Sequence, residues 1–300
     1  MLVLGRADVE ELLDLDELVS ALARAHAELS AGEASMPARI AALAGDAGLL
    51  GAMPAYLPSA GLGCKLVTLF PENKDRPTHQ AAIMLIDPEN GTPVALMDGT
   101  YVTAMRTAAA AALATKLLAR EDSRVLAILG TGVQARAARE VFPRVRAWSE
   151  IRTAGRGEYE DAVRGADVVA ATTHSPDPVV YAEWLAPGAH VSSVGYNAPG
   201  SELDPAIVAG AGVICVESRD SSFAPPPGGA PELKGIDPAS VVELGELVAG
   251  TRSGRTNGEE VTLYKSVGVA VQDLAAAALV LAAAKERGVG LDVPMEEVHA

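Results

Sequence analysis

The sequence predicts an α/β protein in which a doubly wound parallel sheet accompanies a second, α+β domain. Two patterns indicate this class. From Arg124 onward, short apolar runs alternate with glycine-rich turns and helix-like stretches, as parallel strands joined by helices do. Between Leu49 and Asp98, short apolar runs alternate with Pro, Asn, Asp and Gly turns, which indicates an antiparallel sheet. We therefore expect two domains of different architecture.

The first domain is predicted to begin with an amphipathic helix. Apolar side chains recur at helical spacing from Val9 to about Ser30, and Asp8 precedes them as the expected N-cap. The antiparallel strands follow. The alanine-rich stretch from Tyr101 to Arg120 contains no Gly or Pro and predicts a helix that joins the two domains.

The second domain is expected to hold five apolar strands and the helices between them. A final helix is predicted over residues 266–287, and the tail after it could return to the first domain. We place the first domain at residues 1–117, joined by 285–300, and the second at 118–284. The five runs interpreted as strands are 125–129, 150–154, 166–173, 190–195 and 212–218.

Composition excludes several classes of function. The net charge of −15, without a Lys/Arg-rich run, disfavours nucleic acid and anionic membranes as partners. Cys64 and Cys215 lie far apart, with no CxxC motif and no nearby His cluster, so neither a disulfide framework nor a structural metal site is encoded. Every uncharged apolar run is shorter than the roughly 18 residues that a bilayer span needs. A cytoplasmic protein is expected.

One glycine-rich turn stands in the context of a dinucleotide-binding site. The turn Gly130-Thr131-Gly132-Val133-Gln134-Ala135 directly follows the apolar run 125–129 and opens a helix. Gly130 would permit the tight turn, Gly132 would let a pyrophosphate approach the backbone, and Ala135 would allow close helix packing. The helix N-terminus would supply amide donors for phosphates. These residues predict a Rossmann-type NAD(P) site, and the alternative is a purely structural turn.

The residue that selects the cofactor is expected after the next strand. In such units an acidic residue roughly 20 positions on accepts the ribose hydroxyls. Here the strand 150–154 ends in Gly155-Arg156, and an arginine would pair with a 2′-phosphate. NADP(H) is therefore the preferred cofactor, while Glu158 nearby keeps NAD(H) possible. Thr172, which follows another strand on the same side, is also expected to line this site.

Six segments together resemble the ornithine cyclodeaminase/mu-crystallin family. The resemblance implies a substrate domain that also forms a homodimer interface, a Rossmann domain after it, an active site between them, and a small imino or amino acid as substrate. The segments occur in family order over most of the chain. They are Met36-Pro37-Ala38-Arg39, Gly63-Cys64-Lys65-Leu66, Thr103-Ala104-Met105-Arg106-Thr107-Ala108, the turn from Gly130 to Ala135, Gly165-Ala166-Asp167-Val168-Val169 and Thr262-Leu263-Tyr264-Lys265-Ser266-Val267-Gly268.

By this resemblance, Arg39, Lys65 and Arg106 should converge on the substrate carboxylate. Arginine offers a planar donor fork that matches a carboxylate, and lysine supplies a compact charge and a transferable proton. Lys65 lies in an apolar run and Arg106 in an alanine-rich stretch, where an unpaired charge would be costly if buried. The alternative is that each is a solvent-facing charge. Ser266 and Gly268 are expected in the cofactor site.

One departure from the family pattern bears on the chemistry. The cyclodeaminases carry an aspartate that acts on the substrate amine, and the matching segment here places Asn197 there. Because asparagine cannot take up a proton, cyclisation of ornithine is disfavoured. Asn197 is instead expected to orient the imine nitrogen or the nicotinamide amide. The stretch between Arg156 and Asp167 is also shorter than the family pattern.

The leading hypothesis is an NAD(P)H-dependent reductase of cyclic ketimines or α-imino acids, which in reverse is an amino-acid dehydrogenase. Lys65 or a bound water would supply the proton, with Arg106 and Asn197 in the catalytic site. His79 and His174 are weaker candidates, as a proton donor and as a lining of the nucleotide groove. The alternatives are a cyclodeaminase-type lyase that uses NAD+ catalytically and a non-catalytic NADPH-binding protein.

Overall fold

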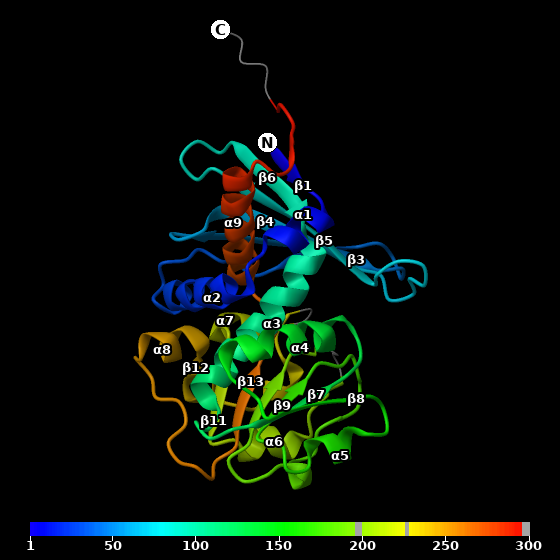
Figure 1. Ribbon diagram of the computed structural model, residues 1–300, viewed down its shortest axis with the longest axis vertical. Helices are drawn as coiled ribbons and strands as arrows, with labels where there is room; N and C mark the ends of the chain where they lie inside the picture. The colour runs from blue at the N-terminus through cyan, green and yellow to red at the C-terminus, as the bar shows by residue number, and fades with distance from the viewer. Residues whose placement is uncertain (196–199, 226–227, 296–300) are drawn as a thin grey trace. The chain divides into compact units, whose positions relative to one another are not determined.

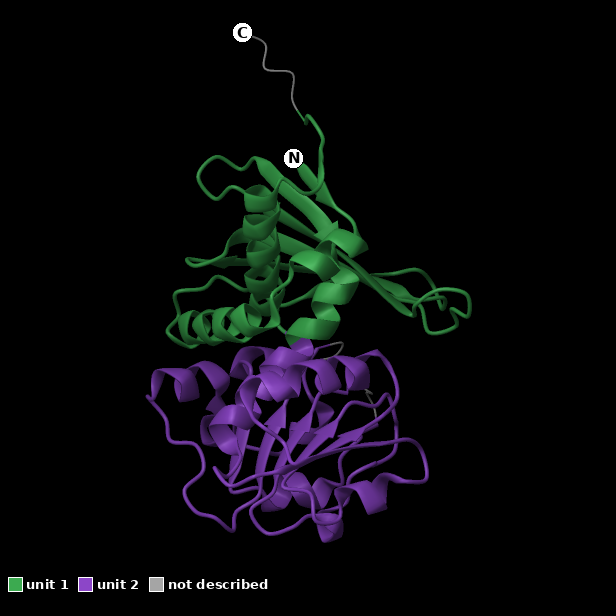
Figure 2. Cartoon of the chain, viewed as in Figure 1, with its two compact units in different colours: residues 1–106, 269–300 green, residues 107–268 purple. Residues whose placement is uncertain are grey.

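The computed structural model describes residues 1–195, 200–225 and 228–295, which form two compact units (Figure 2). Unit 1 contains residues 1–106 and 269–300, and unit 2 contains residues 107–268. These limits differ from the boundaries expected from sequence, 117/118 and 284/285. The difference arises because the last long helix, α9 (Ala270–Arg287), packs against strands of unit 1 along its length.

Unit 1 is built on a mixed sheet, of which Figure 1 labels β1, β3, β4, β5 and β6. Its strand order is β14-β1-β6-β5-β4-β3-β2. The strands from β2 to β6 are antiparallel neighbours, as predicted for residues 49–98, whereas β1 runs parallel to β6. Their bounds are β1 (Leu2–Leu4), β2 (Ile40–Leu43), β3 (Leu49–Leu57), β4 (Gly61–Leu69), β5 (His79–Ile86), β6 (Pro93–Asp98) and β14 (Leu291–Asp292).

The two faces of this sheet differ in what covers them. Lys65 on β4 stands opposite Met53 on β3 and Ile83 on β5, and all three side chains are buried on the face against which α9 packs. Leu66 lies one residue further along β4, so its side chain is on the other face and is 44% exposed. The period of two therefore directs Lys65 toward the helices.

The N-terminal helical region is two helices, α1 (Arg6–Leu12) and α2 (Leu15–Ser30), so the single helix predicted from Val9 to Ser30 was wrong. The side chain of Asp14 accepts hydrogen bonds from the backbone N–H of Asp16 and Glu17, at 2.9 and 3.0 Å. This N-cap starts a new helix. The expected cap, Asp8, lies inside α1 and accepts from the N–H of Gly5.

Unit 2 is a Rossmann-type unit whose strand order is β12-β11-β13-β10-β9-β7-β8, with every pair parallel among its described residues. The fold class predicted from sequence is thereby confirmed. The chain moves from edge strand β8 back past β7 to β9 through the short helix α5, so the order reverses at β7. The strands are β7 (Val125–Leu129), β8 (Glu150–Ala154), β9 (Val168–Ala171), β10 (His190–Ser193), β11 (Val213–Val216), β12 (Val242–Glu243) and β13 (Thr262–Lys265).

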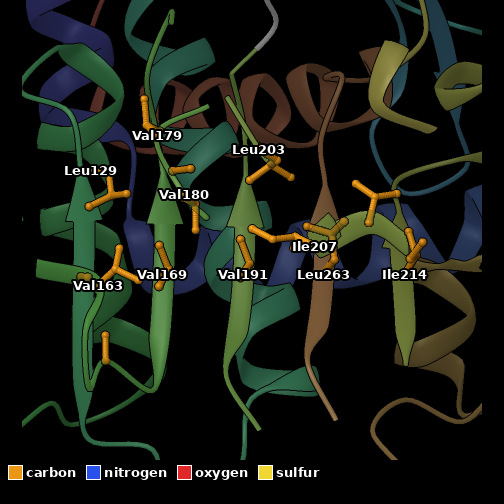
Figure 3. Close-up of a cluster of buried hydrophobic side chains, with 14 of the residues drawn as sticks. Leu129, Val163, Val169, Val179, Val180, Val191, Leu203, Ile207, Ile214 and Leu263 are labelled. Atoms are coloured by element: carbon orange, nitrogen blue, oxygen red, sulfur yellow. The ribbon is translucent and has the colours of Figure 1, made fainter. Parts of the chain in front are cut away.

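Helix α3 leads into unit 2, and further helices connect its strands. Apolar side chains from β7, β9, β10, β13 and β11, labelled Leu129, Val169, Val191, Leu263 and Ile214 in Figure 3, form one buried cluster along the sheet. The helices are α3 (Gly99–Leu118), which begins in unit 1, α4 (Val133–Val145), α5 (Tyr159–Val163), α6 (Pro205–Gly210), α7 (Arg219–Ser222) and α8 (Leu244–Ala249), with short 3-10 helices η1 (Ala182–Trp184), η2 (Pro231–Leu233) and η3 (Pro238–Ser240).

Strand β13 and the start of α9 differ from the sequence expectation. The segment Thr262–Lys265 is a fully buried strand between β10 and β11, although it holds a threonine and a lysine and has no apolar run. The final helix was expected from Ser266 but begins at Ala270. Glu217 accepts hydrogen bonds from the N–H groups of Val267 and Gly268, which delays the helix. None of the described helices is long and apolar enough to cross a membrane.

Candidate active site and nucleotide-binding turn

The buried interior of unit 1 contains a cluster of opposite charges. Lys65 lies on β4, Arg106 lies on α3 and Asp273 lies on α9, and each is at most 4% exposed. The Lys65 Nζ is 2.6 Å from Asp273 Oδ2, and the Arg106 Nε is 3.0 Å from Asp273 Oδ1. One carboxylate therefore bridges two of the cations that the sequence predicts as substrate ligands.

A second residue of α9, Gln272, also holds Arg106. Its Nη1 donates a 2.7 Å hydrogen bond to the side-chain oxygen of Gln272, whose Nε2 lies 3.0 Å from the Nε2 of His26 on α2. Gln272 and His26 are both fully buried. A guanidinium that donates hydrogen bonds from two of its nitrogens has a fixed plane. Its remaining N–H donors are therefore preorganised for a carboxylate ligand.

The electrostatics of the cluster set the protonation of Lys65. Its pKa is lowered from 10.5 to about 8, chiefly by burial and also by the charges of Arg106 and Arg39. Asp273 acts in the opposite direction through its charge and its hydrogen bond. The result is an ammonium that can release a proton near neutral pH, which is the property that a general acid needs.

The other predicted substrate-site residues have different surroundings. Arg39 lies just before β2, is partly exposed, and its charge acts on Lys65. Asn197 falls outside the described residues. His79, the first residue of β5, and His174, after β9, are exposed and lie apart from the Lys65 contacts given above. Both predicted arginines, Arg39 and Arg106, therefore act on Lys65 through their charges.

The glycine-rich turn has the geometry that a dinucleotide requires. Gly130 adopts φ +119°, and a Cβ there would lie 2.9 Å from Thr172 Oγ1, so the position excludes other residues. Gly132 is the N-cap of α4, and a Cβ built on it meets no atom within 4 Å. Thr131, Gly132 and Val133 are exposed at this N-terminus. An open, Cβ-free approach to helix N–H groups fits a pyrophosphate.

Arginines lie on α4 and just after β8, the elements next to this turn in unit 2. Arg136 donates to the carbonyl oxygen of Thr131 at 3.1 Å, and Arg139 donates to Thr153 Oγ1 at the end of β8 at 3.3 Å. Arg156, the residue predicted to select the cofactor, is exposed just after β8. Glu158 is turned back onto the loop, where its carboxylate accepts from the N–H of Gly155 at 3.2 Å.

Three further residues predicted to bind the cofactor make internal hydrogen bonds. Thr172 donates from Oγ1 to the carbonyl oxygen of Leu129, so it closes the turn from the adjacent strand. Ser266 donates to Glu217 Oε1 at 2.7 Å, and Glu217 also accepts from Gly268 N. The hydroxyl of Ser266 and the N–H of Gly268 thus serve to fix the segment between β13 and α9.

A buried polar network joins the carboxyl ends of three strands in unit 2. Glu202 accepts from Thr173 after β9 and from Ser193 Oγ and Gly195 N at the end of β10, at 2.7 to 2.9 Å. Lys265 at the end of β13 donates to Ser193 and Gly195 and pairs with Glu232 in η2 at 2.9 Å. The network fixes the loops at this edge, where parallel sheets bind ligands.

Sequence reasoning missed the anions that pair with the buried cations. Asp273 is the clearest case, because a carboxylate within the alanine-rich helix of residues 270–287 would be costly to bury without a cation. That signal was available from sequence. Glu202, Glu217 and Glu232 lie outside the long helices and the described strands, and only the folded structure shows that they are buried.

The family comparison agrees with this geometry. The model of the ornithine cyclodeaminase/mu-crystallin family matches residues 1–160 and 155–288. The chain belongs to this family. A mouse relative, ketimine reductase mu-crystallin, is 39% identical, and the match covers 78% of this chain and 80% of that protein.

Solved structures of family members have the same fold over their whole length. Thermococcus litoralis Δ1-pyrroline-2-carboxylate reductase, in complex with NADH and L-proline, superimposes with a TM-score of 0.90 at 35% identity, covering 98% of this chain and 100% of that one. An archaeal alanine dehydrogenase dimer with bound NAD gives a TM-score of 0.90 at 34% identity, covering 99% of each chain.

Removal of the Lys65 ammonium should change how stability depends on pH. Between pH 8 and 10.5 the unfolded wild-type chain holds a proton that folded Lys65 has released, so the free energy of unfolding rises with pH, by up to about 3 kcal/mol. Lys65→Met should lack this rise in urea titrations followed by circular dichroism. The exposed Lys74→Met is the matched control and should retain it. An equal rise in Lys65→Met would contradict the assignment.

Substitutions at the two turn glycines should separate folding from cofactor binding. Gly132→Ala has an allowed φ of −79° and open space, so its melting temperature should match wild type while NAD(P)H binding weakens about tenfold or more. Gly130→Ala should lower the melting temperature, because of its positive φ and its contact with Thr172. Calorimetric titration and thermal melts measure both. Wild-type affinity in Gly132→Ala would exclude this turn as the pyrophosphate site.

Proposed function

We propose that the protein is an NAD(P)H-dependent reductase of cyclic ketimines or α-imino acids, and in reverse an amino-acid dehydrogenase. The observation that carries the proposal is the buried triad of Lys65, Arg106 and Asp273, in which an acid of suitable pKa stands beside a fixed guanidinium. Relatives named as ketimine reductase and pyrroline-2-carboxylate reductase support the same reaction class.

The substrate carboxylate would bind to Arg106 and Arg39. Arg106 has its plane set by Asp273 and Gln272, so an incoming carboxylate meets donors that need no reorganisation. Lys65 then holds a proton at Nζ for the imine nitrogen. Bound NAD(P)H supplies the hydride to the C=N carbon. The products are a secondary or primary amine and a neutral lysine, which regains its proton from solvent.

The cofactor is proposed to be NADP(H) in preference to NAD(H). Arg156 follows β8, where the adenine ribose is expected, and Glu158 is engaged with the N–H of Gly155. Arg156 is exposed at this position, and a guanidinium there suits a 2′-phosphate. Asn197 is proposed to orient the imine nitrogen or the nicotinamide amide, and its side chain cannot act as the base that cyclisation of ornithine needs.

We propose that two copies of the chain form a homodimer through the outer face of the unit 1 sheet. Leu66 on β4 lies in register with Ala52 on β3, which lies in register with Ile40 on β2, and Leu50 is on the same face. Ile40, Leu50 and Leu66 are 69%, 43% and 44% exposed. Contiguous apolar side chains on a strand face suit a self-complementary contact between two copies. The archaeal alanine dehydrogenase, which is a dimer, supports this assembly.

Steady-state kinetics test the function. The wild-type protein should oxidise NADPH, and more slowly NADH, with Δ1-pyrroline-2-carboxylate or Δ1-piperideine-2-carboxylate. Arg106→Lys should raise KM about 10- to 100-fold, because a point charge cannot replace the fork that serves both carboxylate and Gln272. The exposed Arg24→Lys on α2 is the control. Ammonia release from ornithine without imine reduction would assign a lyase, and tight NADPH binding without turnover a binding protein.

Light scattering after gel filtration tests the dimer. Leu66→Glu should shift the mass from two chains toward one, because it places a charge on the apolar outer face. Leu291→Glu, at a more exposed leucine on edge strand β14, should leave the mass unchanged. A dimer that persists in Leu66→Glu would place the interface elsewhere, and a monomeric wild type would remove the proposal.

A further inference from the structure

The two oxygens of the Asp273 carboxylate contact different cations, so this residue both neutralises charge and sets where the two cations lie. Oδ2 lies 2.6 Å from Lys65 Nζ, and Oδ1 lies 3.0 Å from Arg106 Nε. Asp273 itself is fully buried on α9. A rigid carboxylate of this kind fixes the separation of the ammonium and the guanidinium, which the proposed reaction uses for different purposes.

We propose that Asp273 is a positioning residue of the imine-reducing site: its carboxylate holds Lys65 and Arg106 side by side and keeps Lys65 protonated until the proton passes to the substrate. This inference rests on the proposed function and adds to it the residue that sets the pH range in which Lys65 stays protonated. Asp273 contacts Lys65 and Arg106, and it acts through them.

The charges that face Lys65 come from three parts of unit 1. Asp273 on α9 favours the ammonium, while Arg106 on α3 and Arg39 before β2 oppose it, as does burial on β4. His26 on α2 reaches the cluster through Gln272 and Arg106. Asp273 is thus the negative charge among the groups that act on Lys65. Its removal would leave an ammonium among guanidinium groups, and such a group releases its proton.

The proton balance makes the two reaction directions respond together. Reduction of a neutral imine consumes one hydride from NAD(P)H and one proton from Lys65, so it needs the ammonium. Oxidation of the amino acid returns a hydride to NAD(P)+ and a proton to Lys65, so it needs the neutral amine. A lower pKa of Lys65 therefore moves the alkaline fall of reduction and the rise of oxidation to lower pH by the same amount.

The experiment measures pH profiles of kcat/KM for Asp273→Asn with a cyclic imine and NADPH, and with the product amino acid and NADP+. The midpoint of both profiles should fall by about one pH unit or more relative to wild type. Asp273→Glu, which restores the carboxylate, should return the midpoint toward wild type even if kcat stays low. Because the substrate titrates identically in every case, its own pKa cancels.

A neighbouring substitution separates this role from general packing. Gln272→Met removes the other contact of α9 with Arg106 but changes no charge, so it should raise KM and leave the midpoint in place. Equal midpoints in wild type and Asp273→Asn would overturn the proposal. So would a Gln272→Met shift as large as that of Asp273→Asn.

A folding measurement keeps the test decisive if Asp273→Asn is unstable. The double variant Lys65→Met/Asp273→Asn buries no unpaired ammonium, so it should melt at a higher temperature than Asp273→Asn alone. A double variant no more stable than the single one would contradict the coupling. The two proposals also fail differently: a wild type that reduces no imine removes the function, whereas active enzymes with unshifted midpoints remove only the role of Asp273.

Discussion

The cost of burying charge governs the interior of both units. In unit 1, Lys65 and Arg106 are buried because Asp273 pairs with both. The carboxylate belongs to α9, which lies at the other end of the sequence from β4. The N-terminal unit therefore depends on the C-terminal helix for its charge balance, and residues 269–295 form one compact unit with residues 1–106.

In unit 2 the buried charges are compensated by a different set of residues. Lys265 is fully buried at the end of β13 and pairs with Glu232, while Glu202 and Glu217 gather backbone N–H and hydroxyl donors. These carboxylates bind the loops that follow the strands. Because loops at the carboxyl edge of a parallel sheet hold the ligand, polar groups that fix them preorganise the site at the edge where the cofactor is expected.

The proposed chemistry divides between the units in a way that follows from their architecture. The helix N-terminus after β7 provides exposed amide donors and an open approach at Gly132, which suits phosphates. The antiparallel sheet provides a covered face, where a lysine can be desolvated and poised near neutral pH. Relatives named reductase and dehydrogenase describe opposite directions of C–N chemistry, and a lysine with a pKa of about 8 suits either direction.

The sequence by itself determined the elements whose signals are local. The strand Val125–Leu129, the turn at Gly130 and the strand Glu150–Ala154 were predicted to the residue, because an apolar run and a positive-φ glycine are properties of the nearest neighbours. Lys65 and Arg106 were also singled out as charges in apolar surroundings. Tertiary structure alone decided that β13 inserts between β10 and β11 and that Asp273 unites the two cations. Both depend on contacts between residues distant in sequence, and no local pattern encodes which distant residues meet.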